Sequence, residues 1–202
     1  DQQDSFYDTR KTGFSVGLAF PISEQGRLSL SYRVSKDSIF NVAAASSNIL
    51  KREEARGSLT TSALGYSYEY DTRITGLNPL GGFVFRFGQE IGGIGGDTKN
   101  ITTNLYVLGQ RKIANEEVTL RAIFEGGHVH SVGANPSRVT DRFFGNGSIR
   151  GFEGNGIGPR DLTAVNQDAL GGNAFAVARF EADFPLGLPE EYGITGGAFI
   201  DV

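Results

Sequence analysis

The sequence predicts an all-β protein, an antiparallel transmembrane β-barrel to which this chain contributes about eight strands. Three observations support this prediction. Apolar residues alternate with small or polar ones along successive runs of about ten residues, the length at which a tilted strand crosses a bilayer. The apolar faces are rich in large aromatic residues, as in the interfacial girdles of membrane barrels. Short connections occur at one end of the runs and long ones at the other.

Eight segments carry the strand pattern, near residues 13–21, 28–38, 59–70, 82–92, 100–111, 117–130, 172–185 and 193–202. The first alternates Phe, Val and Leu with Gly, Ser and Ala, and the second alternates Leu, Tyr and Val with Ser and Arg. The third sets Leu and Tyr against small residues and Glu, and the fourth contains three phenylalanines at every second position. The fifth has the least regular alternation. The sixth alternates apolar residues with Thr, Arg and Glu, and the last two carry acidic residues on one face.

This period of two assigns each side chain to one face of the wall. We expect the following residues to point outward to lipid: Phe14, Val16, Leu18, Leu30, Tyr32, Leu64, Tyr66, Phe83, Phe85, Leu120 and Phe124. The charged residues Arg33, Glu69, Arg86, Arg121, Glu181 and Asp201 should point inward, because charges are unfavourable in contact with lipid. A soluble β-sandwich or small soluble barrel is the alternative, since alternation alone also describes a sheet with one solvated face.

The connections differ in length and composition. Those near 22–27, 71–81, 112–116 and 186–192 are short and contain turn-forming residues, whereas those near 39–58 and 131–171 are long. A glycine-rich loop at 91–97 belongs to the long-loop end. Within the first long connection, Glu53 and Glu54 are expected to lie in a solvated loop.

Composition excludes several classes of protein. The chain has 202 residues, enough for one domain, with a hydrophobic fraction of 39% and no apolar run of the length of a transmembrane helix. The absence of cysteine excludes disulfides and thiol catalysis. A net charge of −4 without a basic cluster argues against a nucleic-acid partner. The first residues form no signal peptide and there is no methionine, so we expect the chain to be a piece of a longer protein.

The longest connection is the most informative part of the sequence. Residues 141–161 are rich in glycine and surround one Arg-Gly-Phe triplet that begins at Arg150. Glycine permits backbone turns that other residues avoid, and so long a loop in a compact domain is typically functional. The glycines lack the following helix and the lysine of a phosphate-binding loop. His128 and His130 are too few for a metal site, so neither a metal nor a cofactor is expected.

Several stretches resemble the barrel of the BamA-type outer-membrane protein assembly factors, in the bacterial surface antigen superfamily. These stretches are 143–145, 149–152, 156–161, 171–174, 180–185 and 198–201. Residues Ile149, Arg150, Gly151 and Phe152 resemble the Val/Ile-Arg-Gly-Phe/Tyr signature of the lid loop in that family, and residues 198–201 resemble its Phe-x-Asp strand. The superfamily also contains two-partner secretion exporters and organelle import channels.

The resemblance implies a sixteen-stranded barrel preceded by periplasmic POTRA domains, which this chain lacks. Residues 1–202 would then form the middle-to-late part of the barrel, with the lid loop at about 131–171. Eight strands of such a wall should not close on themselves. The resemblance also implies that the lid folds into the lumen, where Arg150 meets Glu181 and Asp201, whose strand positions place both carboxylates on the luminal face.

The implied function is the folding and insertion of β-barrel proteins into the bacterial outer membrane, without enzymatic activity. The implied partners are outer-membrane lipid, unfolded client proteins and assembly-complex lipoproteins, the last through the POTRA domains. The alternatives are a polypeptide exporter of the same superfamily and a porin-like passive channel.

Overall fold

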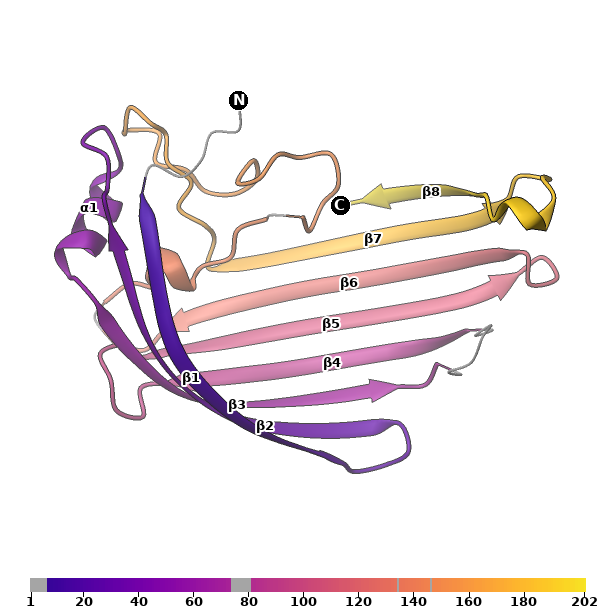
Figure 1. Cartoon of the computed structure of the whole chain (residues 1–202), viewed down its shortest axis with the longest axis horizontal. Coiled ribbons are helices and arrows are strands. Elements are labelled where there is room, and N and C mark those ends of the chain that lie inside the picture. The colour runs from indigo at the N-terminus through magenta and orange to yellow at the C-terminus, as the bar shows by residue number, and fades with distance from the viewer. Residues whose placement is uncertain (1–6, 74–80, 134, 146) are drawn as a thin grey trace.

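Eight strands pair in sequence order to form one curved antiparallel sheet (Figure 1). The computed structural model describes residues 7–73, 81–133, 135–145 and 147–202. The strands are β1 (Asp8–Pro21), β2 (Gly26–Phe40), β3 (Leu59–Asp71), β4 (Gly81–Gly92), β5 (Asn100–Ile113), β6 (Val118–Ser131), β7 (Ala174–Pro185) and β8 (Thr195–Asp201). One α-helix, α1 (Asn48–Ala55), and two short 3-10 helices, η1 (Val139–Asp141) and η2 (Glu190–Tyr192), lie in the connections.

The predicted all-β antiparallel fold is confirmed, and so is its open form. In the described part of the chain β1 and β8 are the two edges of the sheet and do not pair with each other. The largest difference from the predicted strands is at β1, which begins at Asp8 because residues 8–12 remain paired with Lys36–Phe40 of β2. The predicted short connection at 71–81 falls largely on residues 74–80, outside the described part.

Strand register places the predicted sets of side chains on opposite faces. On the outer face Tyr66 lies between Leu30 and Gln89, and on the inner face Arg86 lies between Glu69 and Tyr106. Phe14 and Leu18 are 67% and 68% exposed, so large apolar side chains lie uncovered on the outer face. Tyr32 and Phe85 share this outer face but are half-buried. This arrangement, with apolar side chains outside and charges inside, is typical of a barrel wall surrounded by lipid.

Ion pairs between strands line the inner face, some joining adjacent strands and one reaching across β3. Arg33 of β2 pairs with Glu90 of β4, and Arg86 of β4 pairs with Glu69 of β3 at 2.6 Å. Arg179 of β7 pairs with Glu125 of β6. The alternation of the sequence assigned these residues to one face, and the register determines which residues pair.

The long connections gather at one end of the sheet, around α1 and the loop between β6 and β7 (Figure 1). There Ile39, Leu50, Val139 and Leu170 form a small buried core, with Phe144 packed against it. The expectation of a solvated loop at Glu53 and Glu54 was wrong, because both residues lie in α1 and Glu53 is 5% exposed. Ser47 caps this helix by accepting a hydrogen bond from the Ile49 backbone N–H. Within the described residues, no helix has both the length and the apolar character needed to cross a membrane.

Candidate functional site: the lid loop and its inner-wall contacts

The loop between β6 and β7, residues 132–173, folds back over the inner face of the sheet and is called the lid here (Figure 1). Its two ends are joined by an antiparallel bridge between Phe143 and Gly172, whose backbone N–H groups donate to each other's carbonyls at 2.9 and 2.8 Å. A second bridge joins Arg160 to Ala169. The first bridge closes the base of the lid below Arg150, which reaches towards β8, and the second closes a shorter segment, 161–168, within the lid.

Arg150 contacts carboxylates on two strands. Its Nε and Nη2 donate to Oδ2 and Oδ1 of Asp201 in β8 at 2.8 and 2.5 Å, and its backbone N–H donates to the same carboxylate at 3.0 Å. Its Nη1 lies 2.9 Å from Oε1 of Glu181 in β7. The hydrogen bonds to Asp201 and the nearby Glu181 hold the pKa of Arg150 above its usual range. The guanidinium therefore bridges the last two strands of the sheet from the lid.

Aromatic and charged neighbours complete this contact. The Arg150 guanidinium carbon lies 3.7 Å from the centre of the Phe199 ring, a cation–π contact. Arg121 of β6 approaches Glu181 at 3.4 Å and Asp183 at 2.7 Å, so the two arginines share the Glu181 carboxylate. The site consequently couples the lid to β6, β7 and β8 through one network of charges.

The rest of the predicted motif has different surroundings. Gly151 has φ +87°, a left-handed conformation that allows the chain to turn directly after Arg150. Ile149 is half-buried, and Phe152 is 60% exposed. The structure thus brings Arg150, Glu181 and Asp201 together, whereas Phe152 lies on the surface of the lid.

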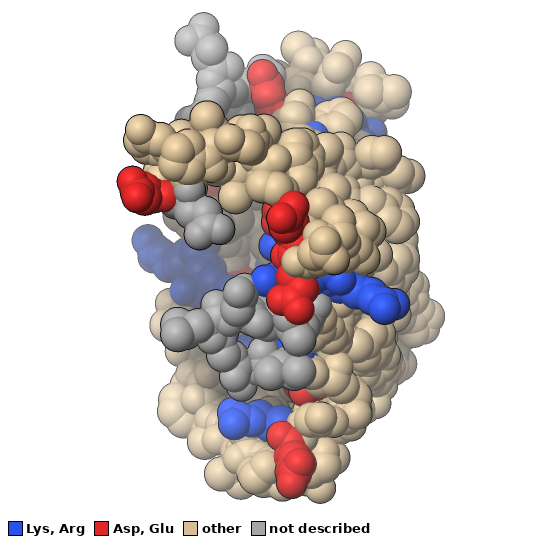
Figure 2. Space-filling model, turned by 90° about the vertical axis from the view of Figure 1, so that its right-hand side faces the viewer, with Lys and Arg blue, Asp and Glu red and all other residues tan. Residues whose placement is uncertain are grey.

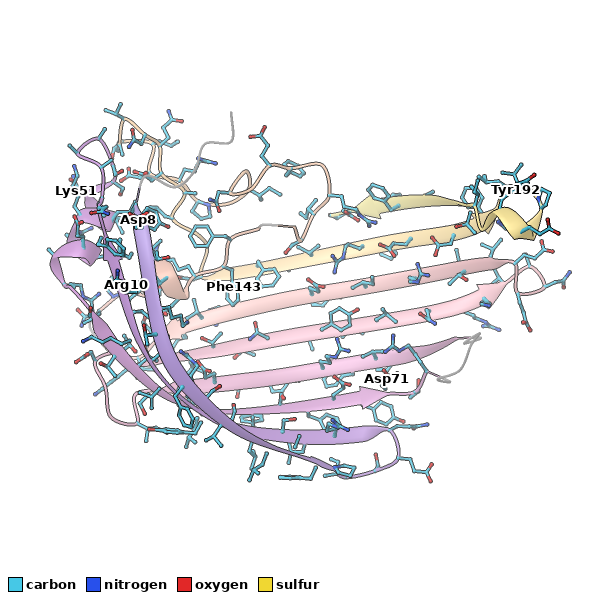
Figure 3. All side chains as sticks on the ribbon, in the orientation of Figure 1. Asp8, Arg10, Lys51, Asp71, Phe143 and Tyr192 are labelled. Carbon is cyan, nitrogen blue, oxygen red and sulfur yellow. The ribbon has the colours of Figure 1, made fainter. Side chains whose placement is uncertain are left out.

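A second contact joins the base of the lid to the wall (Figure 3). Phe143 packs against Phe175 of β7 with ring centroids 4.9 Å apart. Both rings lie over Gly127 of β6, where an added Cβ would come within 2.4 Å of the Phe175 ring and 2.7 Å of the Phe143 ring. Any larger residue at position 127 would occupy the space that these rings fill.

A third contact, between the lid and α1, was not predicted. Arg138 is 2% exposed, and its Nε donates to Glu53 at 3.1 Å while its Nη2 donates to the Asp37 carbonyl at 3.4 Å. Burial raises the pKa of the adjacent Asp141 carboxyl. No local pattern indicates this pairing, because Arg138 and Glu53 are 85 residues apart in the chain.

The segment 161–168 of the lid contacts the start of α1. Asp168 accepts a hydrogen bond from the Ser47 backbone N–H at 2.6 Å, and Asp161 accepts one from the Ser47 hydroxyl at 2.5 Å. Hydrogen bonds from Ser47 and Thr163 lower the pKa of Asp161. Ser47 directly before Asn48 is the one sequence signal for this helix start.

No metal-binding cluster of three or more His, Asp or Glu residues occurs within the described ranges. The two histidines stack on each other at the long-loop end of β6, with ring centroids 6.3 Å apart. A pair of imidazoles alone falls short of the usual ligand number for zinc.

Comparison with known proteins identifies the family. The Omp85 superfamily domain matches residues 1–202 of the chain. The chain belongs to the Omp85 superfamily. It is 30% identical to the outer membrane protein assembly factor BamA of Neorickettsia risticii over 202 residues, all of this chain and 27% of that protein.

Relatives in the Omp85 superfamily also include eukaryotic proteins. The mouse sorting and assembly machinery component 50 homolog is 30% identical over 151 residues, which are 73% of this chain and 31% of that protein. The human homolog is 31% identical over the same length. The chain thus spans less than a third of the length of each of these curated relatives.

A solved structure of the same family shares the fold. The crystal structure of BamA from Haemophilus ducreyi lacking POTRA domains 1–3 superimposes with a TM-score of 0.79 at 20% sequence identity. The match covers 96% of this chain and 41% of that one. Family membership and this fold confirm that the chain is a BamA-like outer-membrane β-barrel segment.

Proposed function

We propose that this chain is part of the barrel of a bacterial outer-membrane assembly factor that folds and inserts β-barrel proteins. A bacterial assembly factor matches the whole chain, whereas the mouse and human relatives match 73% of it. The observation that carries the proposal is the contact of Arg150 with Asp201 and Glu181, which attaches the lid to the inner wall.

The proposed role of Arg150 is to keep the lid in one position while the barrel folds and inserts a client protein. A guanidinium presents a planar fork that can bond two carboxylates at once, and such charge-assisted bonds are stronger than neutral ones. The Asp201 side chain is 3% exposed, so removing its arginine would leave a poorly compensated charge. The wall itself depends on strand pairing and on lipid contact, neither of which involves Arg150.

The proposed partners are unfolded β-barrel clients and the lipid of the outer membrane. Assembly-complex lipoproteins would bind through the POTRA domains that precede the barrel in this family. The long-loop end of the sheet would face the cell exterior and the short-turn end the periplasm, as in other outer-membrane barrels.

The test is complementation of a strain depleted of its own assembly factor by the full-length protein carrying substitutions at Arg150. We expect Arg150→Ala to impair client assembly and to expose the lid to external protease, and Arg150→Lys to be impaired as well, because an ammonium cannot fork across two carboxylates. Glu181→Ala and Asp201→Ala should share the defect. The control is Glu153→Ala, which removes an exposed charge from the same loop.

Wild-type growth and an unchanged protease pattern for all the Arg150, Glu181 and Asp201 variants would refute the proposed role of the lid contact. Reconstitution in vesicles separates the function classes. Acceleration of client folding supports an insertase, whereas solute conductance without client folding indicates a porin, and release of a secreted polypeptide across the vesicle indicates an exporter.

A further inference from the structure

The outer face of the sheet has a hollow near its short-turn end. Its volume is about 670 Å³, and it spans β5, β6, β7 and β8. The outward-facing residues around it are Gly109, Arg111, Leu120, Ala122, Phe180, Ala182, Ala198 and Ile200. Elsewhere on this face large side chains such as Phe14, Leu18 and Leu64 project outward.

The hollow arises from two neighbouring rows of cross-strand partners. In one row Arg111, Leu120, Ala182 and Ala198 lie side by side, and in the other Gly109, Ala122, Phe180 and Ile200 do. The glycine and the alanines form the floor, and a Cβ added at Gly109 would have no atom within 4 Å. Leu120, Phe180 and Ile200 are between 41% and 66% exposed and form the walls.

Arg111 places a positive charge at the rim of this apolar hollow. It is exposed and lies two residues before Ile113, where β5 ends at a short turn. The hydrogen bonds and ion pairs of the described residues include none from the Arg111 side chain, whereas the inward-facing Arg33, Arg86 and Arg121 each have a carboxylate partner. Figure 2, viewed from the short-turn end, shows an outer wall with few charges apart from basic side chains that reach across it near the turns.

An outward-facing arginine near the short turns lies close to the membrane interface, where lipid phosphate groups can bind it. Charge on the lipid face costs least close to the interface, and a long side chain can extend its head group to that level. The guanidinium fork matches phosphate oxygens in geometry and charge. From Arg111 the hollow extends to the row of Gly109, one step farther from the short turns and therefore deeper in the bilayer.

We propose that this hollow is a binding site for a glycerophospholipid of the leaflet at the short-turn end. Its phosphate binds Arg111, and one acyl chain lies in the hollow between Leu120, Phe180 and Ile200. A peptide lying in the hollow is a poor occupant, because the backbone groups between β5, β6, β7 and β8 are paired with one another and those of a segment on the outer face would meet lipid unsatisfied. This proposal rests on the membrane position of the sheet and not on the proposed insertase function.

The test is native mass spectrometry of the full-length protein in a non-ionic detergent, titrated with palmitoyl-oleoyl phosphatidylglycerol. We expect Arg111→Ala to weaken binding of the first lipid by about tenfold, the effect of losing one charge-assisted contact. Ala182→Phe fills the floor of the hollow and should weaken it similarly. The matched control is Arg10→Ala, which removes an outward arginine at the opposite, long-loop end, where Arg10 lies over the Phe40 ring (Figure 3).

Palmitoyl-oleoyl glycerol, which lacks the phosphate, should bind the wild-type protein about tenfold more weakly than the phospholipid and be insensitive to Arg111→Ala. If Arg111→Ala yields no folded barrel, the same measurement is made on Arg111→Gln, which retains a long polar side chain without the charge. Equal phosphatidylglycerol binding by the wild-type, Arg111 and Ala182 proteins would overturn the proposal. An equal loss of phosphatidylglycerol binding in Arg10→Ala would also overturn it, because that result would indicate a general effect of surface charge. Loss of binding in the Arg111 variant but not in Ala182→Phe would overturn it too, because the acyl chain would then not lie in the hollow.

Discussion

Replacing Glu53 by alanine should release the base of the lid from α1. Glu53 and Arg138 have side chains that are 7% and 2% exposed, so the substitution leaves a buried guanidinium whose remaining bond is to the Asp37 carbonyl at 3.4 Å. Breaking a buried pair from one side costs about 3–5 kcal/mol. Glu53 also accepts from Arg56 at 3.3 Å, but that arginine is exposed and its contribution is small.

The loss of the Glu53–Arg138 ion pair can be measured by hydrogen exchange of the full-length protein in nanodiscs. We expect the local opening free energy of the backbone amides in α1 and η1 to fall. Strands β4 to β6 should retain their protection, because the substitution leaves their pairing intact. Arg52→Ala, on the exposed side of the same helix, is the matched control and should change the opening free energy by less than about 0.5 kcal/mol.

The double variant Glu53→Leu with Arg138→Met separates charge from packing. Replacing both partners of a buried ion pair by apolar residues of similar volume is often nearly neutral, so the double variant should recover most of the protection that Glu53→Ala loses. Unchanged exchange in Glu53→Ala would refute the reasoning. Exchange in the double variant as fast as in the single one would show that the shape of the pair, and not its charge balance, holds the lid.

Three further predictions concern the other lid contacts. Gly127→Leu should displace the Phe143 ring and raise protease cleavage at the base of the lid, whereas Gly154→Leu, at an exposed lid position with open space around an added Cβ, should not. Phe199→Leu should weaken the cation–π contact of Arg150 by about 0.5–1 kcal/mol, measured as faster exchange of the Arg150 backbone amide. Because hydrogen bonds lower the pKa of Asp161, its contact with the α1 cap should be fully present above its ordinary pKa of 3.8 and be lost as the pH falls through the lowered value. Amide exchange in 161–164, corrected for intrinsic rates, should therefore rise in acid, and Asp161→Asn should make it high and independent of pH.

The regular wall was predictable because strand geometry has a period of two. Alternation alone placed Leu64 and Tyr66 on the outer face and Glu181 and Asp201 on the inner one, and strand register agrees. It could not identify the ion-pair partners. Arg121, for example, contacts Glu181 and Asp183 because of how β6 aligns with β7, which depends on pairing and not on either strand alone.

The lid contact of Arg150 was indicated by a motif resemblance, whereas the contacts at the base of the lid had no comparable signal. Glu53 lies in a short run of charged residues of both signs, which is usually solvated, yet it is 5% exposed because Arg138 of the lid packs against it. The lipid-facing hollow likewise depends on small residues from four strands becoming neighbours.

Local periodicity and composition were enough to predict the strands, their two faces and the loop that carries the Arg-Gly-Phe triplet. The folded chain alone revealed that Arg138 is buried against Glu53, that Arg121 and Arg150 share Glu181, and that Arg111 borders an apolar hollow. The physical reason is that these contacts join residues distant along the chain, whose proximity is set by strand register and by loop packing across the end of the sheet.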